Sequence, residues 1–250
     1  MSPIKPLVLP LLLTILPAGP VDAACDDPPA RGVKWIGCDK QGADLGRAEL
    51  RNGTFTHTDF SGANLAGARL GGSDLSFTNF AGANLEGARL DDTRFLSADL
   101  EEANLKDAIL NGAQIHRAVL VKADMEGVRA TGASFWQSDL TDARLGGAVL
   151  READLRQVTL DFAFMEQADL SQADLERASL EDVRLRGAIL EGANLKSTRL
   201  HYADLREADL RDASLVGAEL VETRLEGARL GRTRWVDRRL CQDDSVGECR

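Results

Sequence analysis

Residues Ser61–Leu90 read SGANLAGARLGGSDLSFTNFAGANLEGARL. The first ten of them, SGANLAGARL, return twenty positions later as AGANLEGARL at Ala81–Leu90. Inside each copy a shorter unit recurs every five residues: a small residue, a polar residue, a leucine and two polar or glycine positions. This five-residue period runs without insertion from Ala43 to Trp235, so the sequence predicts a repeat architecture for most of the chain.

The five-residue period favours extended chain over helix. On an α-helix, leucines five residues apart would be turned by about 140° from one another and could not form one apolar face. In extended chain, residues two apart point to the same side, so each leucine and the small residue before it face inward together. A corner after each inward pair closes a square coil in twenty residues. All seven prolines fall within the first thirty residues, as an uninterrupted backbone ladder requires.

The units, which read roughly A-(D/N)-L-x-x, resemble those of the pentapeptide-repeat family over Ala43–Trp235. The resemblance implies an all-β fold, a right-handed four-sided parallel β-helix (a solenoid) of about ten coils. It also implies end structures of the kind seen in exported members. The residues that match those ends are Trp35, Gly37, Cys38 and Asp39 at the amino end and Trp235, Cys241 and Cys249 at the carboxyl end.

The first 23 residues have the plan of a secretory signal peptide: a cation, an apolar run, and small residues before a cut after Ala23. We therefore expect a periplasmic or secreted bacterial protein without stable membrane insertion, since the apolar run is short and contains Pro10. The predicted domains are the signal peptide (1–23), an amino-terminal cap (24–40), the repeat β-helix (41–240) and a carboxy-terminal disulfide cap (241–250).

The four cysteines lie outside the repeats, at Cys25, Cys38, Cys241 and Cys249. An even number in an exported chain predicts disulfides. Three pairings are open, of which Cys25–Cys38 with Cys241–Cys249 is the simplest. No zinc-binding spacing is present.

The sequence contains no pattern that predicts catalysis, a cofactor or a metal site. The three histidines, His57, His116 and His201, build neither a metal triad nor a Ser-His-Asp arrangement on a four-sided coil. The glycines occupy fixed repeat positions and form no phosphate-binding loop. A formal charge of −10 argues against binding to nucleic acid or to an anionic membrane.

Outward-facing aromatic and apolar residues are scarce, and seven of them are candidate contacts for a partner. They are Phe77, Leu96, His116, Trp136, Phe162, Phe164 and Tyr202. Shifts of twenty residues stack Leu96, His116 and Trp136 in one column. Phe162 falls on an adjacent side with Phe164 just around the corner, and the tyrosine lies further along.

The leading hypothesis is a non-enzymatic, exported scaffold, a protein-binding or structural module. Its partner would be an unidentified protein, and a homodimer remains open. A second hypothesis follows from the family resemblance: some cytosolic members imitate duplex DNA and bind a type II topoisomerase. The acidic charge fits that role, whereas the leader and the cysteines do not. A third hypothesis, a carbohydrate-active β-helix enzyme, requires a carboxylate cluster in a cleft.

Overall fold

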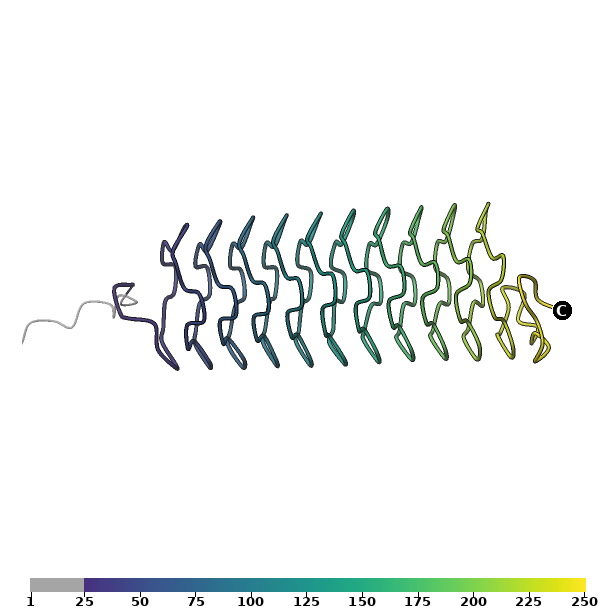
Figure 1. Ribbon diagram of the computed structural model, residues 1–250, viewed down its shortest axis with the longest axis horizontal. Coiled ribbons are helices and arrows are strands. Elements are labelled where there is room, and N and C mark those ends of the chain that lie inside the picture. Colours follow the sequence, from purple (N-terminus) through teal and green to yellow (C-terminus); the bar gives the residue numbers. More distant parts are fainter. Residues whose placement is uncertain (1–24) are drawn as a thin grey trace, which may run out of the picture.

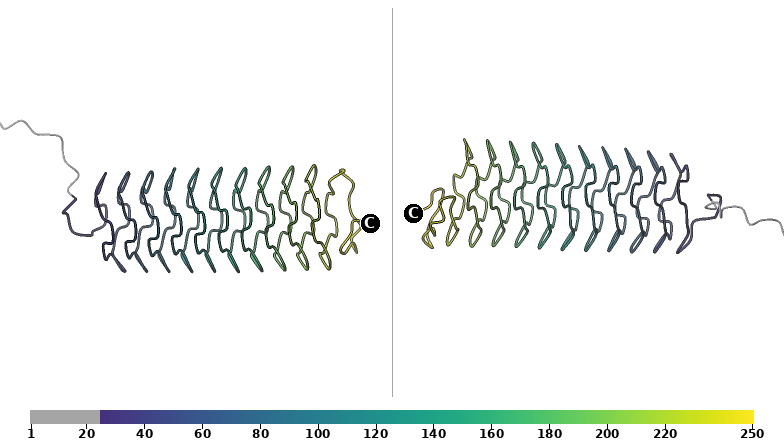
Figure 2. Two further views of the ribbon diagram at one scale, coloured as in Figure 1. Left: turned by 90° about the horizontal axis from the view of Figure 1, so that it is seen from above. Right: turned by 180° about the vertical axis from the view of Figure 1, so that it is seen from behind.

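The structure is a computed structural model and describes residues 25–250. The predicted signal peptide lies outside the described residues. The chain forms a long rod of stacked coils that runs from the amino-terminal cap to the carboxyl end (Figure 1). Two further views show the same uninterrupted stack from other sides (Figure 2).

Each coil is a square of twenty residues, as the sequence predicts. Parallel bridges join a residue to the one twenty positions later, from Lys34↔Thr54 to Ser214↔Arg234. Each side contributes one bridged residue per coil, immediately before an inward leucine, and residues 25–250 contain neither a helix nor a longer strand. The fold is the expected right-handed, four-sided parallel β-helix.

The four sides are named A to D by the residues in their bridges. Side A carries Asp44, side B carries Glu49, side C carries Thr54 and side D carries Asp59, each followed by every twentieth residue. The parallel bridges begin at Lys34, inside the range predicted as the amino-terminal cap.

The corners are two-residue turns in which the second residue has a positive φ. At one corner the Ala48 amide donates to the Leu45 carbonyl at 3.0 Å, and Arg47 between them has φ 59°. Only a type II turn combines this bond with one positive φ at the third position. Glycine occupies the second turn position at several corners, as at Gly67 with φ 64°. The structure repeats this turn at all four corners, where non-glycine side chains also adopt the left-handed conformation.

The Asp or Asn of each unit closes the turn that follows it. Asn84 Oδ1 accepts the Glu86 amide at 3.1 Å, and Asp139 Oδ1 accepts the Thr141 amide at 3.0 Å. This Asx bond satisfies an amide that the turn leaves without a backbone partner, which explains the D/N position in the repeat. The outward amides also bond between coils, as Asn104 Nδ2 does to Asn84 Oδ1 at 3.2 Å.

The interior is a stack of inward leucines, phenylalanines and alanines, most of them fully buried. Trp35 closes the amino end of this core, with its ring 5.7 Å from Phe55 and 6.4 Å from Phe60. A Cys25–Cys38 disulfide fixes the segment that precedes the first coil.

At the carboxyl end the chain reverses and covers the last coil. Val246 pairs antiparallel with Arg229, and Leu240 pairs antiparallel with Arg234, so the open backbone edge is occupied. A Cys241–Cys249 disulfide closes this segment. The structure therefore adopts the simplest of the three pairings that the sequence left open.

Candidate functional site

A surface groove runs along side A in the carboxy-terminal half of the rod. It has a volume of about 790 Å³. One wall is the corner between sides D and A, the floor is the bridged column of side A, and the other wall is the corner between sides A and B. Residues of the first wall are Asp142, Phe162, Asp182 and Tyr202; those of the floor are Phe164, Arg184, Asp204 and Arg224; those of the second wall are Glu166, Arg186 and Arg206. We call this hollow the aromatic groove.

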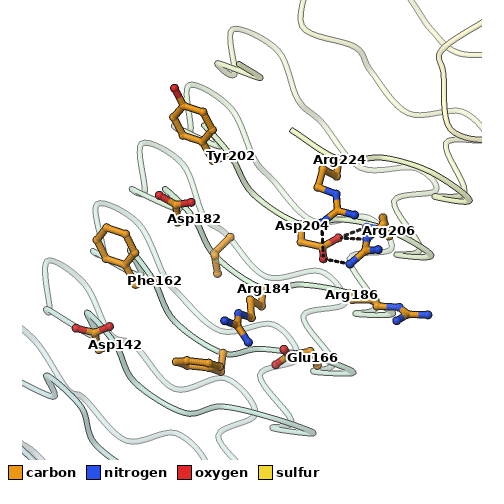
Figure 3. Close-up of a pocket in the computed structure, with 12 residues that line it drawn as sticks. Asp142, Phe162, Glu166, Asp182, Arg184, Arg186, Tyr202, Asp204, Arg206 and Arg224 are labelled. Carbon is orange, nitrogen blue, oxygen red and sulfur yellow. Dashed lines mark hydrogen bonds and ion pairs between the residues drawn. The ribbon is translucent and has the colours of Figure 1, made fainter. Parts of the chain in front are cut away.

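Successive coils place the residues of the first wall in one row, which Figure 3 shows across from Arg186 and Arg206. Phe162 is 50% exposed and Tyr202 is 47% exposed. Both rings sit at the second turn position, with φ of 62° and 60°. This left-handed conformation is unfavourable for a large side chain and costs about 1–2 kcal/mol per residue. Glycine would adopt this backbone conformation without that penalty, so each ring lowers the stability of its turn relative to glycine.

The floor of the groove holds an aromatic ring covered by a cation. The Arg184 guanidinium carbon lies 4.6 Å from the centre of the Phe164 ring, within the range of a cation–π contact. Phe164 is bridged to Arg144 and Arg184, which fixes its place in the column.

The other arginines of the groove are tied to carboxylates of the same chain. Arg206 Nε donates to Asp204 Oδ1 at 2.7 Å, and Arg224 lies 3.8 Å from the other oxygen of that carboxylate. The hydrogen bond from Arg206 holds the pKa of Asp204 below its ordinary value. Arg186 pairs with Glu207 at 2.7 Å. Arg186 and Arg206 are therefore each paired with a carboxylate, and Arg224 shares Asp204 with Arg206.

A second, smaller hollow of about 390 Å³ lies on side C in the amino-terminal half, beside Phe77, Leu96 and His116. His57 stacks on the Phe77 ring at 4.9 Å between centres. His116 meets the edge of the Trp136 ring at 6.1 Å. The second hollow thus brings Phe77, Leu96 and His116 together, while Trp136 lies beside His116 outside the lining, and the role of all four as contacts stays a prediction.

The structure changes the grouping of the other three candidates. Phe162, Phe164 and Tyr202, which the sequence spread over two sides and several coils, all line the aromatic groove. Sequence reasoning missed Asp142 and Asp182. The signal was present, because the two acids alternate with the aromatic residues at intervals of twenty.

No group of three or more His, Cys, Asp or Glu side chains between residues 25 and 250 is arranged to hold a metal ion. His201 pairs with Glu219 at 2.9 Å, while His57 stacks on Phe77 and His116 meets the edge of the Trp136 ring. Across the same part of the chain, no helix has the length and apolar character needed to cross a membrane.

A family model described as pentapeptide repeats matches most of the chain, in eight copies. The matched residues are 31–67, 58–96, 98–137, 138–177, 178–215 and 193–232. No curated protein matches the chain significantly.

Among solved structures, the chain is similar to HetL, a pentapeptide repeat protein involved in heterocyst differentiation regulation from the cyanobacterium Nostoc sp. strain PCC 7120. The identity is 31% over 84% of this chain and 94% of that chain, with a TM-score of 0.32. Rfr23, a pentapeptide repeat protein from the cyanobacterium Cyanothece 51142, is 41% identical over 39% of this chain and 63% of that chain, with a TM-score of 0.30. QnrB1, a plasmid-mediated fluoroquinolone resistance protein, is 21% identical over 77% of this chain and 91% of that chain, with a TM-score of 0.32.

Proposed function

Because the chain belongs to the pentapeptide-repeat family, we propose that it is a non-enzymatic scaffold that binds a protein partner outside the cytoplasm through the aromatic groove. The observation that carries the proposal is the gathering of Phe162, Phe164 and Tyr202 in one groove. Exposed aromatic rings are the side chains that most often dominate the energy of protein interfaces. Phe162 and Tyr202 are about half exposed, so packing in the core does not account for them.

Two features support a place outside the cytoplasm. The first 23 residues have the pattern of a cleavable signal. Both ends of the β-helix are closed by disulfides, and structural disulfides persist in oxidising compartments.

The arrangement of charge does not favour imitation of DNA. A DNA mimic needs rows of uncompensated acids that imitate the phosphates of a strand, which follow one another about every 3.4 Å along the helix axis. On side B the Asp209 carboxylate is paired with Arg211 at 2.6 Å and with Arg229 at 3.2 Å. At the next corner Asp212 is paired with Arg232. Arginines of the next coil, Arg229 and Arg232, therefore compensate both of these acids.

Site-specific photocrosslinking in living cells tests the proposal. A photoreactive phenylalanine analogue replaces Phe162 in the full chain, and a matched variant carries it at Glu102. Glu102 occupies the same turn position three coils earlier, where φ is 55° and the side chain is exposed. We expect a chain cut after Ala23 in the exported fraction, and a discrete protein adduct from position 162 that position 102 does not give.

Two results would contradict the proposal. An uncut chain that stays in the cytoplasm would remove the exported role. Equal adducts from positions 162 and 102 would show that the aromatic groove is not a preferred contact surface.

A further inference from the structure

The first wall of the aromatic groove alternates carboxylates and rings, one per coil. Asp142, Phe162, Asp182 and Tyr202 occupy the same turn position in consecutive coils, with φ between 54° and 62°, and Glu222 continues the row. Figure 3 shows the first four side chains as a single row along the groove. Rings therefore recur every two coils, and carboxylates recur every two coils midway between them.

This spacing matches one kind of peptide backbone. Neighbouring coils of a parallel sheet are about 4.8 Å apart, so two coils span about 9.6 Å. A polyproline II helix has three residues per turn and rises about 3.1 Å per residue, so one turn spans about 9.3 Å. A polyproline II segment that lies along this wall would place every third residue beside a ring. The residues between them would lie near the carboxylates.

Other backbone conformations fit the row less well. An α-helix repeats every 5.4 Å, and two of its turns exceed two coils by about 1.2 Å. On a β-strand the side chains of one face recur about every 6.6 Å, which matches neither one coil nor two. Strand addition to side A also lacks free backbone groups, because the Arg184 amide donates to Ala163 and its carbonyl accepts from Met165.

The unpaired carboxylates of the groove lie mainly on its first wall. Of the groove carboxylates in the described chain, Asp142, Glu166 and Asp182 form no ion pair, whereas Asp204 is paired with Arg206. Arg184 lies over the Phe164 ring and pairs with no carboxylate. The lining holds four acids and four arginines in all, but the arginines lie on the floor and the second wall, so a cationic ligand meets Asp142 and Asp182 along the first wall.

We propose that the aromatic groove binds a proline-rich, basic peptide segment in the polyproline II conformation. The Phe162 and Tyr202 rings pack against prolines one turn apart, and Asp142 and Asp182 pair with the long side chains of lysines or arginines one or two positions from those prolines. Aromatic grooves recognise such segments because the peptide is ordered before it binds and loses little entropy. This inference rests on the proposed protein-binding role and names the chemistry of the partner.

Synthetic peptides test the ligand class on the disulfide-bonded chain. The probe is fluorescent (Pro-Pro-Lys)4, in which lysine recurs once per turn. (Gly-Ser-Lys)4 keeps the charge without the polyproline conformation, and (Pro-Pro-Glu)4 keeps the conformation with the opposite charge. We expect (Pro-Pro-Lys)4 to bind in fluorescence anisotropy at least about tenfold more tightly than either control, a difference of about 1.4 kcal/mol.

Single variants test the groove. Phe162→Ala and Tyr202→Ala should each weaken binding of (Pro-Pro-Lys)4 about tenfold, as truncation of an interface anchor does. Ile189→Ala is the matched control, because Ile189 is an exposed apolar residue (41%) at the same height on side B. Asp182→Asn should weaken binding and its salt dependence. Glu152→Gln should change neither, since Glu152 holds the equivalent turn position at another corner.

A swap tests the spacing itself. The double variant Asp182→Tyr with Tyr202→Asp keeps the composition and the turn positions but brings the rings to one coil apart. It should bind (Pro-Pro-Lys)4 no better than Tyr202→Ala. Thermal unfolding of each variant shows whether the β-helix is retained, and Phe162→Gly, which relieves the positive φ, provides a second truncation that folding tolerates.

Three results would overturn the inference: (Gly-Ser-Lys)4 binding as tightly as (Pro-Pro-Lys)4, the swapped variant binding as tightly as the parent, or no binding of (Pro-Pro-Lys)4. If the photocrosslink at position 162 still captures a protein in that case, the protein-binding role stands and only the ligand class is wrong. If neither binds, both proposals fail.

Discussion

Replacement of Ser138 by alanine tests how the corners satisfy their backbone groups. At the Ile115 corner the usual turn bond is absent. Instead the Ser138 hydroxyl, one coil further on, accepts the Ala118 amide at 3.0 Å and donates to the Ile115 carbonyl at 2.6 Å. Ser138 is 1% exposed, so water does not replace it. Ser138→Ala therefore leaves a buried amide and a buried carbonyl without partners.

Ser73 provides a matched control with the same pair of bonds. Its hydroxyl accepts the Gly53 amide and donates to the Leu50 carbonyl, both at 3.0 Å. Here, however, the amide also donates directly to the carbonyl at 3.2 Å. Ser73→Ala therefore removes hydrogen bonds without leaving either backbone group unpartnered.

The two replacements should differ by about 1 kcal/mol or more in the free energy of unfolding. A lost hydrogen bond costs about 0.5–1.5 kcal/mol, whereas a buried unsatisfied group costs about 1–3 kcal/mol. We expect a larger fall in the urea midpoint for Ser138→Ala at equal m-value, since comparison requires similar surface exposure on unfolding. Hydrogen exchange of the Ala118 amide should accelerate about tenfold, which corresponds to about 1.4 kcal/mol. Equal midpoints with an unchanged Ala118 amide would refute the reasoning and show that the corner closes into an ordinary turn.

Three further predictions concern the stability of the rod. Leu145→Ala empties a fully buried position in the middle of the stack and should cost about 2–5 kcal/mol by urea unfolding; a loss below 1 kcal/mol would mean that the coil collapses around the gap. Replacing Cys241 and Cys249 together by serine should lower stability by about 2–3 kcal/mol and speed hydrogen exchange first in the last coils; uniform exchange along the rod would contradict a capping role. The hydrogen bond from Arg211 holds the pKa of Asp209 below its ordinary value of 3.8, so its stabilisation is present above about pH 3.8 and is lost as the pH falls through the lowered pKa. Asp209→Asn should therefore lose less stability than the parent between about pH 4 and pH 2, and parallel pH profiles would contradict this.

The sequence alone determined the coil. A strict five-residue period cannot form one face of a helix, and the twenty-residue echo between Ser61 and Leu90 specifies four sides. The register of the coils can be predicted from the sequence because every unit follows the same local pattern. A small residue and a leucine face inward, and an Asp or Asn closes the next turn. The stacking of Leu96, His116 and Trp136 also followed from counting by twenty.

Only the tertiary structure decided which corner residues share a groove. The sequence spread Phe162 and Phe164 over two sides and left Tyr202 apart, because the period says which residues face outward but not where a turn residue points. In the structure both corner rings line the groove along side A, where Phe164 lies on the floor. Likewise, only the structure shows that Asp204 pairs with Arg206 of its own coil and lies near Arg224 of the next coil, while Asp182 forms no ion pair. A long side chain on one coil has several possible partners at similar distances on the neighbouring coils. Three-dimensional packing, and not position in the repeat, determines which of them it contacts.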